Sequence, residues 1–246
     1  MSMPNAMTFI GHLGELRKRI ILVLVVLLMA MIAGLFIAPQ ILHYLKSRPP
    51  ASDMVWNVFS PWDSAKIYMS VALAFSIVVT LPYILYQIWA FVKKGLEPVE
   101  QNAAFMYIPF ALISFIIGLC FSYFIVFPMS LAFTTSIAKN LGFSETYGVS
   151  QYFSFMFSII IPVSLAFELP IIVMFLTKLG VLNPKRLNAL RRHAYLILVI
   201  TASLISPPEI ISHLMVFIPL VLLYEISIML SKVVYRRKNQ EAFTSG

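Results

Sequence analysis

The sequence predicts an all-α integral membrane protein with six transmembrane helices, because of its composition and its long uncharged runs. Hydrophobic residues make up 60% of the 246-residue chain and charged residues 11%, whereas water-soluble domains carry about 25% charged residues. Several uncharged runs exceed the roughly 18 residues that mark a transmembrane helix. A third observation is Glu168, which lies within an otherwise uncharged apolar run at 151–177. Because a carboxyl group at mid-membrane depth costs roughly 2.5–3.5 kcal/mol, this residue indicates a functional polar position inside the bilayer.

The first four spans are expected at residues 20–38, 67–92, 104–135 and 152–177. The first follows the basic triplet Arg17-Lys18-Arg19, an arrangement that secretory signal peptides share. Its apolar stretch is longer than the core of a signal peptide, and more spans follow it. We therefore expect it to be retained as the first transmembrane helix.

The final apolar stretch, residues 194–231, is expected to form two short helices rather than one. One helix would be far longer than the ~30 Å hydrocarbon core at ~1.5 Å per residue, and Pro207-Pro208 would break it. Two spans, at 194–206 and 211–231, also leave the basic loop between the fourth and fifth spans on the same side as the basic C-terminal tail. Such short spans indicate a locally thinned bilayer or packing against partners.

Six spans put both termini and 14 of the 18 lysines and arginines on the cytoplasmic side, as the positive-inside rule requires. Topology therefore explains the net charge of +8, and no aromatic–basic interleaving of the nucleic-acid-binding type accompanies it. The whole chain, residues 1–246, is expected to be a single membrane domain. Its longest hydrophilic outer segment, about 39–66, carries Trp56 and Trp62, which suit the membrane interface.

The sequence lacks the common motifs of catalysis and of metal or nucleotide binding. It contains no zinc-protease H-E-x-x-H, no G-x-S-x-G nucleophile elbow and no phosphate-binding loop. Asp53 and Asp63 both lie in the outer segment, so a mid-membrane aspartyl pair is excluded. Cys120 allows neither an intrachain disulfide nor a metal-ligand pair and is expected to be a small packing residue. We expect no enzymatic activity, no cofactor and no metal.

The N-terminal segment is expected to form an amphipathic helix at the cytoplasmic surface that runs into the first span. Apolar side chains recur at helical spacing on one face, while His12, Glu15 and Arg19 fall on another. The basic residues are explained by topology, but Glu15 is not. The alternative is that Glu15 only pairs with Arg19 at the i,i+4 spacing.

Further carboxylates occur in the first cytoplasmic loop, where topology would require only basic residues. Glu97 and Glu100 lie there, and carboxylates can accept guanidinium groups in a bidentate manner. The alternative is an ordinary solvated turn.

Three other polar positions lie within or beside the later spans. Glu168 precedes Leu169-Pro170, and it either faces a groove or is protonated and bonded to a neighbouring helix. Glu209 follows the paired prolines of the outer turn, with His213 one helical turn later; the alternative is an ordinary exposed turn. Glu225 in the last span is a second candidate for a buried carboxylate, or it extends to the cytoplasmic surface.

Together these segments resemble the TatC family, the polytopic subunit of the twin-arginine protein translocase, over essentially the whole chain. The resemblance rests on five motifs in order: H-L-G-E-L-R-K-R at 12–19, P-Y-I-L-Y-Q-I-W-A-F at 82–91, F-I-V-F-P at 124–128, F-E-L-P at 167–170 and S-P-P-E at 206–209.

The resemblance implies a concave, glove-like arrangement of six helices in a bacterial-type cytoplasmic membrane. It implies that the protein recognises signal peptides with a twin-arginine motif and exports folded proteins. The implied partners are a TatA-type single-span subunit, a TatB subunit in three-component systems, and further copies of the chain. The proton-motive force would supply the energy, without nucleotide hydrolysis.

The resemblance also implies roles for particular residues. Glu15 and Glu100 match the acidic receptor for the arginine pair, and three neighbouring positions are associated with recognition: Leu16, Arg17 and Phe91. We expect the two glutamates to converge on one cytoplasmic site, where bidentate geometry favours arginine over lysine.

Glu168 matches an intramembrane glutamate that faces the concave groove, and outer-side roles would fall to Pro49, Glu209 and His213. Two of these depart from the family pattern, which often has aspartate at the position of Glu209 and glutamine at the position of His213.

Two other functions fit the residues without the resemblance. A secondary transporter would use Glu168, alone or with Glu225, as a proton-linked carboxylate, although the chain shows no internal repeat of the inverted-repeat type. A membrane insertase or structural subunit is the third alternative.

Overall fold

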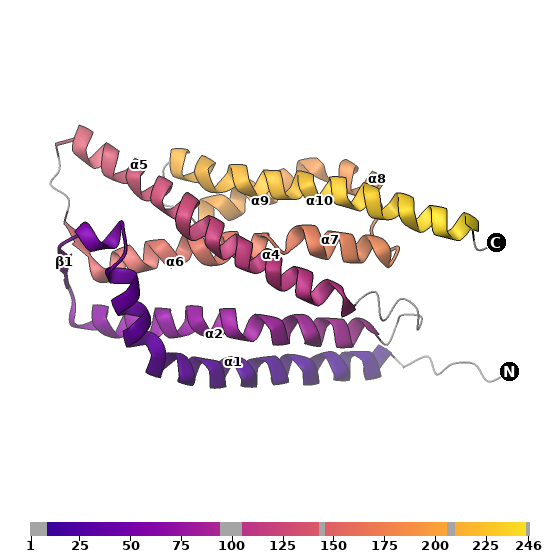
Figure 1. The fold of residues 1–246 in the computed structure, drawn as a ribbon, viewed down its shortest axis with the longest axis horizontal. Coiled ribbons are helices and arrows are strands. Elements are labelled where there is room, and N and C mark those ends of the chain that lie inside the picture. The colour runs from indigo at the N-terminus through magenta and orange to yellow at the C-terminus, as the bar shows by residue number, and fades with distance from the viewer. Residues whose placement is uncertain (1–8, 94–104, 143–145, 206–209, 245–246) are drawn as a thin grey trace. The chain divides into compact units, whose positions relative to one another are not determined.

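The computed structural model describes residues 9–93, 105–142, 146–205 and 210–244 (Figure 1). The chain forms two compact units. The first comprises residues 1–44 and 68–108, and the second comprises residues 45–67 and 109–246. Five helical stretches among the described residues are long and apolar enough to cross a membrane: Gly14–Lys46, Pro61–Val92, Tyr107–Asn140, Val149–Lys178 and His213–Arg236.

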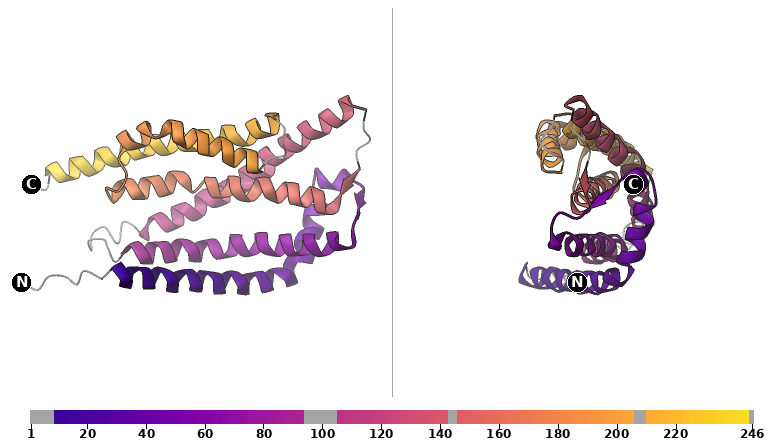
Figure 2. Two further views of the ribbon diagram at one scale, coloured as in Figure 1. Left: turned by 180° about the vertical axis from the view of Figure 1, so that it is seen from behind. Right: turned by 90° about the vertical axis from the view of Figure 1, so that its left-hand side faces the viewer.

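The first unit is built on two antiparallel helices that run side by side, α1 (Phe9–Lys46) and α2 (Pro61–Val92) (Figures 1 and 2). The expected amphipathic segment and the first span are one continuous helix. Gly34 brings the two backbones together, because a Cβ atom at this residue would lie 2.9 Å from the carbonyl oxygen of Ala72. Small residues at such positions allow close helix packing in membranes, where no hydrophobic force drives helices together.

Helix α2 begins at a capping sequence in the second unit. Asp63 Oδ2 accepts hydrogen bonds from the backbone N–H groups of Phe59 (3.1 Å) and Ser60 (3.0 Å), while the backbone N–H of Asp63 donates to the Ser60 carbonyl. Pro61 occupies the first helical position, where its missing N–H removes no helical hydrogen bond. The segment S-P-W-D thus starts the helix by satisfying donors that would otherwise lack acceptors.

The third span is not a uniform helix. Helix α4 (Tyr107–Phe121) continues through a π-helical segment, η3 (Ser122–Val126), into α5 (Phe127–Asn140). Pro128 has no N–H to donate one turn back, which accounts for a local change from the α-helical hydrogen-bond pattern. Ser122, in the π-helical segment, lies 3.0 Å from Ser164 Oγ and so contacts the fourth span.

The fourth span is broken in two, into α6 (Val149–Ala166) and α7 (Leu169–Lys178), with Glu168 at the break. Pro170 cannot donate to the carbonyl one turn earlier. Ser114 Oγ of α4 donates to the carbonyl oxygen of Phe167 over 2.6 Å and supplies a side-chain donor at this interruption. The expected fourth span at 152–177 therefore falls within one helical stretch, Val149–Lys178, which is interrupted at Glu168.

The segment predicted to lie on the outer side contains a short helix, η1 (Ala51–Asp53), and a strand, β1 (Trp56–Asn57), which pairs in parallel with β2 (Tyr147–Gly148). The Trp56 ring packs against Tyr152 at 4.9 Å and Phe153 at 5.8 Å between centroids. The Trp56 ring therefore covers α6, and its predicted place at the membrane interface stays a prediction. Trp62 is 79% exposed, so its predicted place at the interface stays a prediction.

The C-terminal part comprises α8 (Pro184–Ala189), α9 (Arg191–Ile205) and α10 (Ile210–Thr244). Helix α9 is short, as expected: its 15 residues reach about 22 Å at 1.5 Å per residue. Helix α10 has 35 residues, so the prediction of a short final helix is wrong. It packs along α7, with buried Ile228 against Val173 and with Thr177 Oγ1 2.7 Å from Ser231 Oγ.

Candidate functional site

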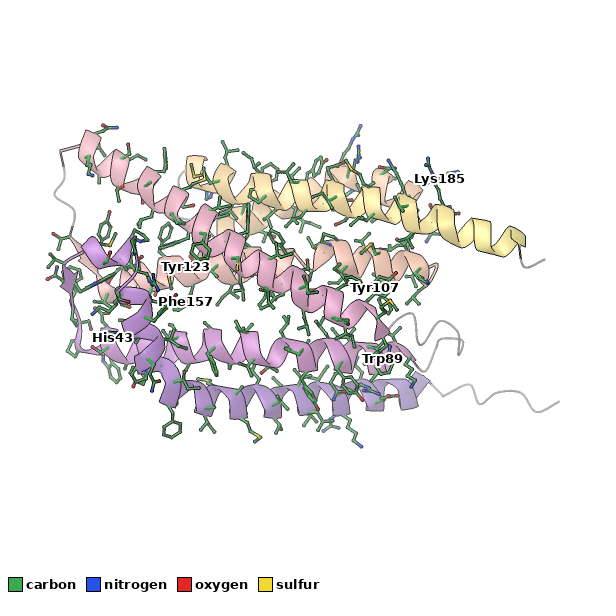
Figure 3. All side chains as sticks on the ribbon, in the orientation of Figure 1. His43, Trp89, Tyr107, Tyr123, Phe157 and Lys185 are labelled. Atoms are coloured by element: carbon green, nitrogen blue, oxygen red, sulfur yellow. The ribbon has the colours of Figure 1, made fainter. Side chains whose placement is uncertain are left out.

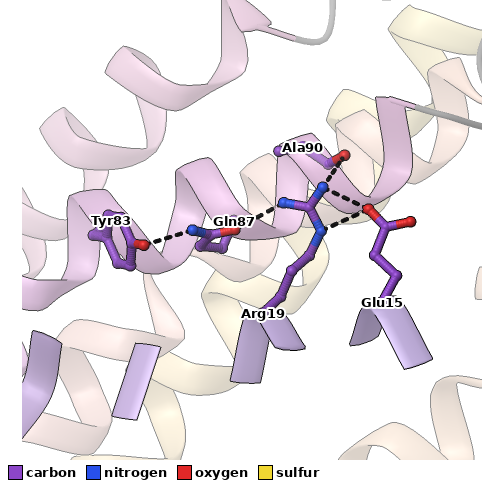
Figure 4. A network of polar contacts seen from close by, with 5 residues as sticks. All are labelled: Glu15, Arg19, Tyr83, Gln87 and Ala90. Carbon is purple, nitrogen blue, oxygen red and sulfur yellow. Dashed lines mark hydrogen bonds and ion pairs between the residues drawn. The ribbon is translucent and has the colours of Figure 1, made fainter. Parts of the chain in front are cut away.

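A polar network joins the N-terminal part of α1 to the C-terminal part of α2 in the first unit (Figure 4). Arg19 donates to one oxygen of Glu15, Oε1, from both Nε (3.0 Å) and Nη2 (2.6 Å). Its Nη1 donates to Gln87 Oε1 over 2.7 Å, and its Nη2 also donates to the carbonyl of Ala90 over 3.0 Å. Gln87 Nε2 in turn donates to the hydroxyl of Tyr83 over 2.7 Å.

Helical spacing accounts for the arrangement. Glu15 and Arg19 are four residues apart on α1, and Tyr83 and Gln87 are four apart on α2, so each pair shares a face of its helix. The side chains of Arg19 and Glu15 are only 19% and 13% exposed, so their interaction is less screened than that of a surface ion pair. The i,i+4 contact between Glu15 and Arg19 is confirmed, but it is one part of a contact between helices.

An apolar pocket lies beside this network and shares two of its residues, Arg19 and Gln87. Its volume is about 250 Å³. Leu16 and Phe91, both expected at a recognition site from the family resemblance, line this pocket. The remaining lining is aliphatic and comes from the same two helices: Ile20, Val23, Leu24, Ile84 and Ile88. The end of the helix pair thus combines an oriented carboxylate with a space for an apolar group.

Of the two other residues of the predicted site, only Arg17 lies in the described part of the chain. Arg17 is exposed and does not line the pocket. Glu100, like Glu97, lies outside the described residues, so its predicted convergence with Glu15 stays a prediction. Trp89, farther along α2, packs edge-to-face against Phe105 with 5.0 Å between ring centroids, and Lys93 Nζ lies 4.9 Å from the Trp89 ring centroid (Figure 3).

Glu168 is buried at the break between α6 and α7, with 5% of its surface exposed. Within the described part of the chain, neither of its carboxyl oxygens has a hydrogen-bond partner. The alternative of a protonated glutamate bonded to a neighbouring helix is therefore not observed in that part. Burial of a carboxyl group without hydrogen bonds is unfavourable, which supports a role other than packing.

Glu225 is not an isolated intramembrane carboxylate. Its Oε2 accepts from Arg191 Nη2 over 2.7 Å, and its Oε1 accepts from the hydroxyl of Tyr195 over 2.5 Å. Tyr224 packs against Tyr195 at 5.9 Å between ring centroids and donates to the carbonyl of Leu187 over 3.0 Å. Glu225 therefore ties α10 to α9, and this pairing weighs against its use as a free proton carrier.

The residues predicted to lie on the outer side are not gathered into a described site. Pro49 is exposed and His213 is half-buried, while Glu209 lies outside the described residues. Cys120, expected to be a packing residue, is instead exposed. It borders a second apolar pocket, of about 300 Å³, which Tyr123 and Phe157 also line (Figure 3).

Sequence reasoning missed Gln87 and Tyr83 as members of the site. Both lie in the segment P-Y-I-L-Y-Q-I-W-A-F, which indicated only the family. A signal was present, because a tyrosine and a glutamine four residues apart in an apolar helix can bond to each other and require a polar neighbour.

Comparisons with known proteins agree in one family. The model of the family described as Sec-independent protein translocase protein (TatC) matches residues 11–219. The TatC protein of Halalkalibacterium halodurans is 42% identical over 231 residues, which are 94% of this chain and 91% of that protein. TatCy of Bacillus subtilis is 41% identical over 238 residues, 97% of this chain and 94% of that protein. A crystal structure of a twin-arginine translocase receptor TatC is similar, with a TM-score of 0.80 and 31% identity over 91% of this chain and 99% of that chain.

Proposed function

Since the chain belongs to the TatC family of Sec-independent protein translocase subunits, we propose that the α1–α2 end of its first unit binds the arginine pair of twin-arginine signal peptides. The protein is thus a multi-pass bacterial membrane protein of a translocase rather than an enzyme. The proposal concerns which residues act as the receptor. Glu15 and Glu100 supply the carboxylates, with Leu16, Arg17 and Phe91 around them.

The observation that carries the proposal is the combination of Glu15 with the adjacent apolar pocket. Glu15 is a largely buried carboxylate whose direction is set by hydrogen bonds from Arg19. A carboxylate held in place recognises a guanidinium through paired hydrogen bonds, which a lysine ammonium cannot reproduce. The pocket lined by Leu16 and Phe91 would exclude water next to these bonds and so strengthen them.

The proposed topology has six spans and both termini in the cytoplasm, with α9 as the short fifth span. It rests on the excess of basic residues in the segments assigned to the inside. It would put Glu15 and Glu100 on the same, cytoplasmic side, where a signal peptide arrives before export. Pro49, Glu209 and His213 would then lie on the outer side, as contacts for partner subunits.

The proposed partners are a TatA-type single-span subunit, a TatB subunit where the system has three components, and further copies of this chain. Folded cargo would be exported at the expense of the proton-motive force. Glu168 would provide a polar position for the signal peptide within the bilayer, because its buried carboxyl oxygens have no hydrogen-bond partner within the described residues.

The test is export of a folded reporter in cells that lack their own TatC and receive this chain with a TatA-type partner. The reporter carries either a twin-arginine or a twin-lysine signal peptide. Glu15→Gln and Glu100→Gln remove each charge with little change in shape. Glu145→Gln, which removes a glutamate from the segment assigned to the outer side, is the matched control.

We expect export of the twin-arginine reporter only, loss of export in the Glu15→Gln and Glu100→Gln variants, and normal export in the Glu145→Gln variant. Binding of the free signal peptide to the purified chain should fall in the same two variants. Export that persists in both variants, with the chain present at normal levels, would show that the receptor site lies elsewhere in the protein.

A further inference from the structure

The contacts of Gln87 show that α2 holds Arg19 in one position. An arginine side chain has only hydrogen donors, so the amide atom of Gln87 that faces it must be the oxygen. The amide nitrogen then requires an acceptor, and the Tyr83 hydroxyl provides it at 2.7 Å. Gln87 is buried, with 8% of its surface exposed. Tyr83 therefore fixes the orientation of the Gln87 amide, and the amide fixes one side of the guanidinium.

Arg19 is held by α2 at two points and contacts Glu15 with the rest of its guanidinium. Nη1 donates to Gln87 Oε1, and Nη2 donates to the carbonyl oxygen of Ala90. Nε and Nη2 both donate to Glu15 Oε1. The planar guanidinium cannot rotate about one bond without breaking the others. The direction of the Glu15 carboxylate is therefore set by α2 through Arg19 (Figure 4).

We infer that Gln87 and Tyr83 are positioning residues for signal-peptide binding, which act on the Glu15 carboxylate through Arg19. The inference rests on the proposed function of Glu15. A glutamate side chain that is free to change rotamer must be ordered when a ligand binds, and this ordering lowers affinity. The Tyr83–Gln87–Arg19 contacts remove this requirement before the peptide arrives, and they fix the direction from which an arginine can approach.

A different role for Arg19 makes the opposite prediction. If Arg19 were a competitor that occupies Glu15 until the peptide displaces it, weakening its hold on α2 would make displacement easier. Loss of the Gln87 acceptor would then leave affinity unchanged or raise it. A positioning role requires that the same change lowers affinity and reduces the preference for arginine over lysine.

The experiment measures binding of fluorescent twin-arginine and twin-lysine signal peptides to the purified full chain in lipid nanodiscs. Gln87→Leu removes the acceptor for Arg19 at similar volume, and Tyr83→Phe removes only the hydroxyl. Gln40→Leu, at an exposed glutamine of the same unit, and Tyr86→Phe, at an exposed tyrosine of α2, are the matched controls. Each site variant is also made in a Glu15→Gln background, because residues that act through one another have non-additive effects.

We expect Gln87→Leu to weaken twin-arginine binding about tenfold and Tyr83→Phe about threefold, with a smaller effect on twin-lysine binding. In the Glu15→Gln background, Gln87→Leu should change affinity less than about twofold. Both controls should bind as the unchanged chain does. If Gln87→Leu impairs folding, the milder Tyr83→Phe provides the same comparison.

Three results separate the inference from the proposed function. If Glu15→Gln lowers affinity while Gln87→Leu and Tyr83→Phe do not, the positioning role is wrong and the receptor role of Glu15 stands. If Gln87→Leu weakens binding equally in the Glu15→Gln background, its effect does not pass through Glu15, and the inference is overturned. If Glu15→Gln leaves affinity unchanged, the proposed function itself fails.

Discussion

The close contact between α1 and α2 at Gly34 allows a direct test of the packing of the first unit. A Cβ atom at Gly34 would lie 2.9 Å from the Ala72 carbonyl oxygen, 3.1 Å from Ala72 Cα and 3.2 Å from Phe75 Cδ1. Two of these atoms belong to the backbone and cannot rotate away. To reach an ordinary contact of 3.4 Å, the helices would have to separate locally by about 0.5 Å, as overpacked sites require.

Gly34→Ala is expected to destabilise the first unit by about 1–2 kcal/mol. Overpacking of a close contact costs about 1–3 kcal/mol. The higher helix propensity of alanine than of glycine offsets up to about 1 kcal/mol of this cost. Gly14→Ala is the matched control on the same helix, because no atom lies within 4 Å of its added Cβ. It should leave stability unchanged or raise it slightly.

Hydrogen exchange of the α1 and α2 amides, followed by mass spectrometry in detergent, measures the effect within this unit. Exchange should be faster in the Gly34→Ala variant and unchanged or slower in the Gly14→Ala variant. Thermal unfolding of the whole chain provides a second measurement. Equal protection of the two variants would refute the argument that the Gly34 contact fixes the spacing of α1 and α2.

Three further predictions concern charged residues. Glu168→Leu should raise the free energy of unfolding by about 1–2 kcal/mol, because neither carboxyl oxygen of Glu168 has a hydrogen-bond partner among the described residues. The same variant should export less of the reporter. A loss of stability in thermal unfolding would contradict this prediction. Asp63→Ala should destabilise the start of α2 by about 1–2 kcal/mol, through loss of two backbone hydrogen bonds, with faster exchange of the first amides of α2 as the readout. Glu225→Gln and Arg191→Gln should each lower thermal stability, and the double variant should lose less than their sum; additive losses would show that the two residues do not interact.

Much of the fold could be predicted from the sequence, because hydrophobicity determines membrane spans locally. Each apolar run of sufficient length must form a helix in the bilayer, where unsatisfied backbone groups are costly. The five long helical stretches fall where the runs predict them. The π-helical segment near Pro128 and the break at Glu168 could not be predicted in detail, because a proline removes a hydrogen bond without specifying how neighbouring helices replace it.

The length of the final helix is a second feature that could not be predicted from the sequence. Pro207-Pro208 predicted the separation of α9 from α10, but not that α10 would extend to Thr244. Most residues after Ser231 are charged or polar, a pattern that predicts a tail rather than a membrane span. Helix length beyond an apolar run depends on local propensity rather than on the bilayer, and such ends are poorly indicated by hydrophobicity.

By itself the sequence determined the class of protein, the family and the choice of Glu15 as a candidate receptor carboxylate. A charged residue that topology does not require is conspicuous in a chain with 11% charged residues. Only the tertiary structure decided what holds the Glu15–Arg19 pair in place. Arg19 lies one turn from Glu15 in the sequence, but Gln87 lies 68 residues from Arg19. Hydrogen bonds are directional and short-ranged, so the pairing of these two residues depends on the packing of α1 against α2, which no local pattern specifies.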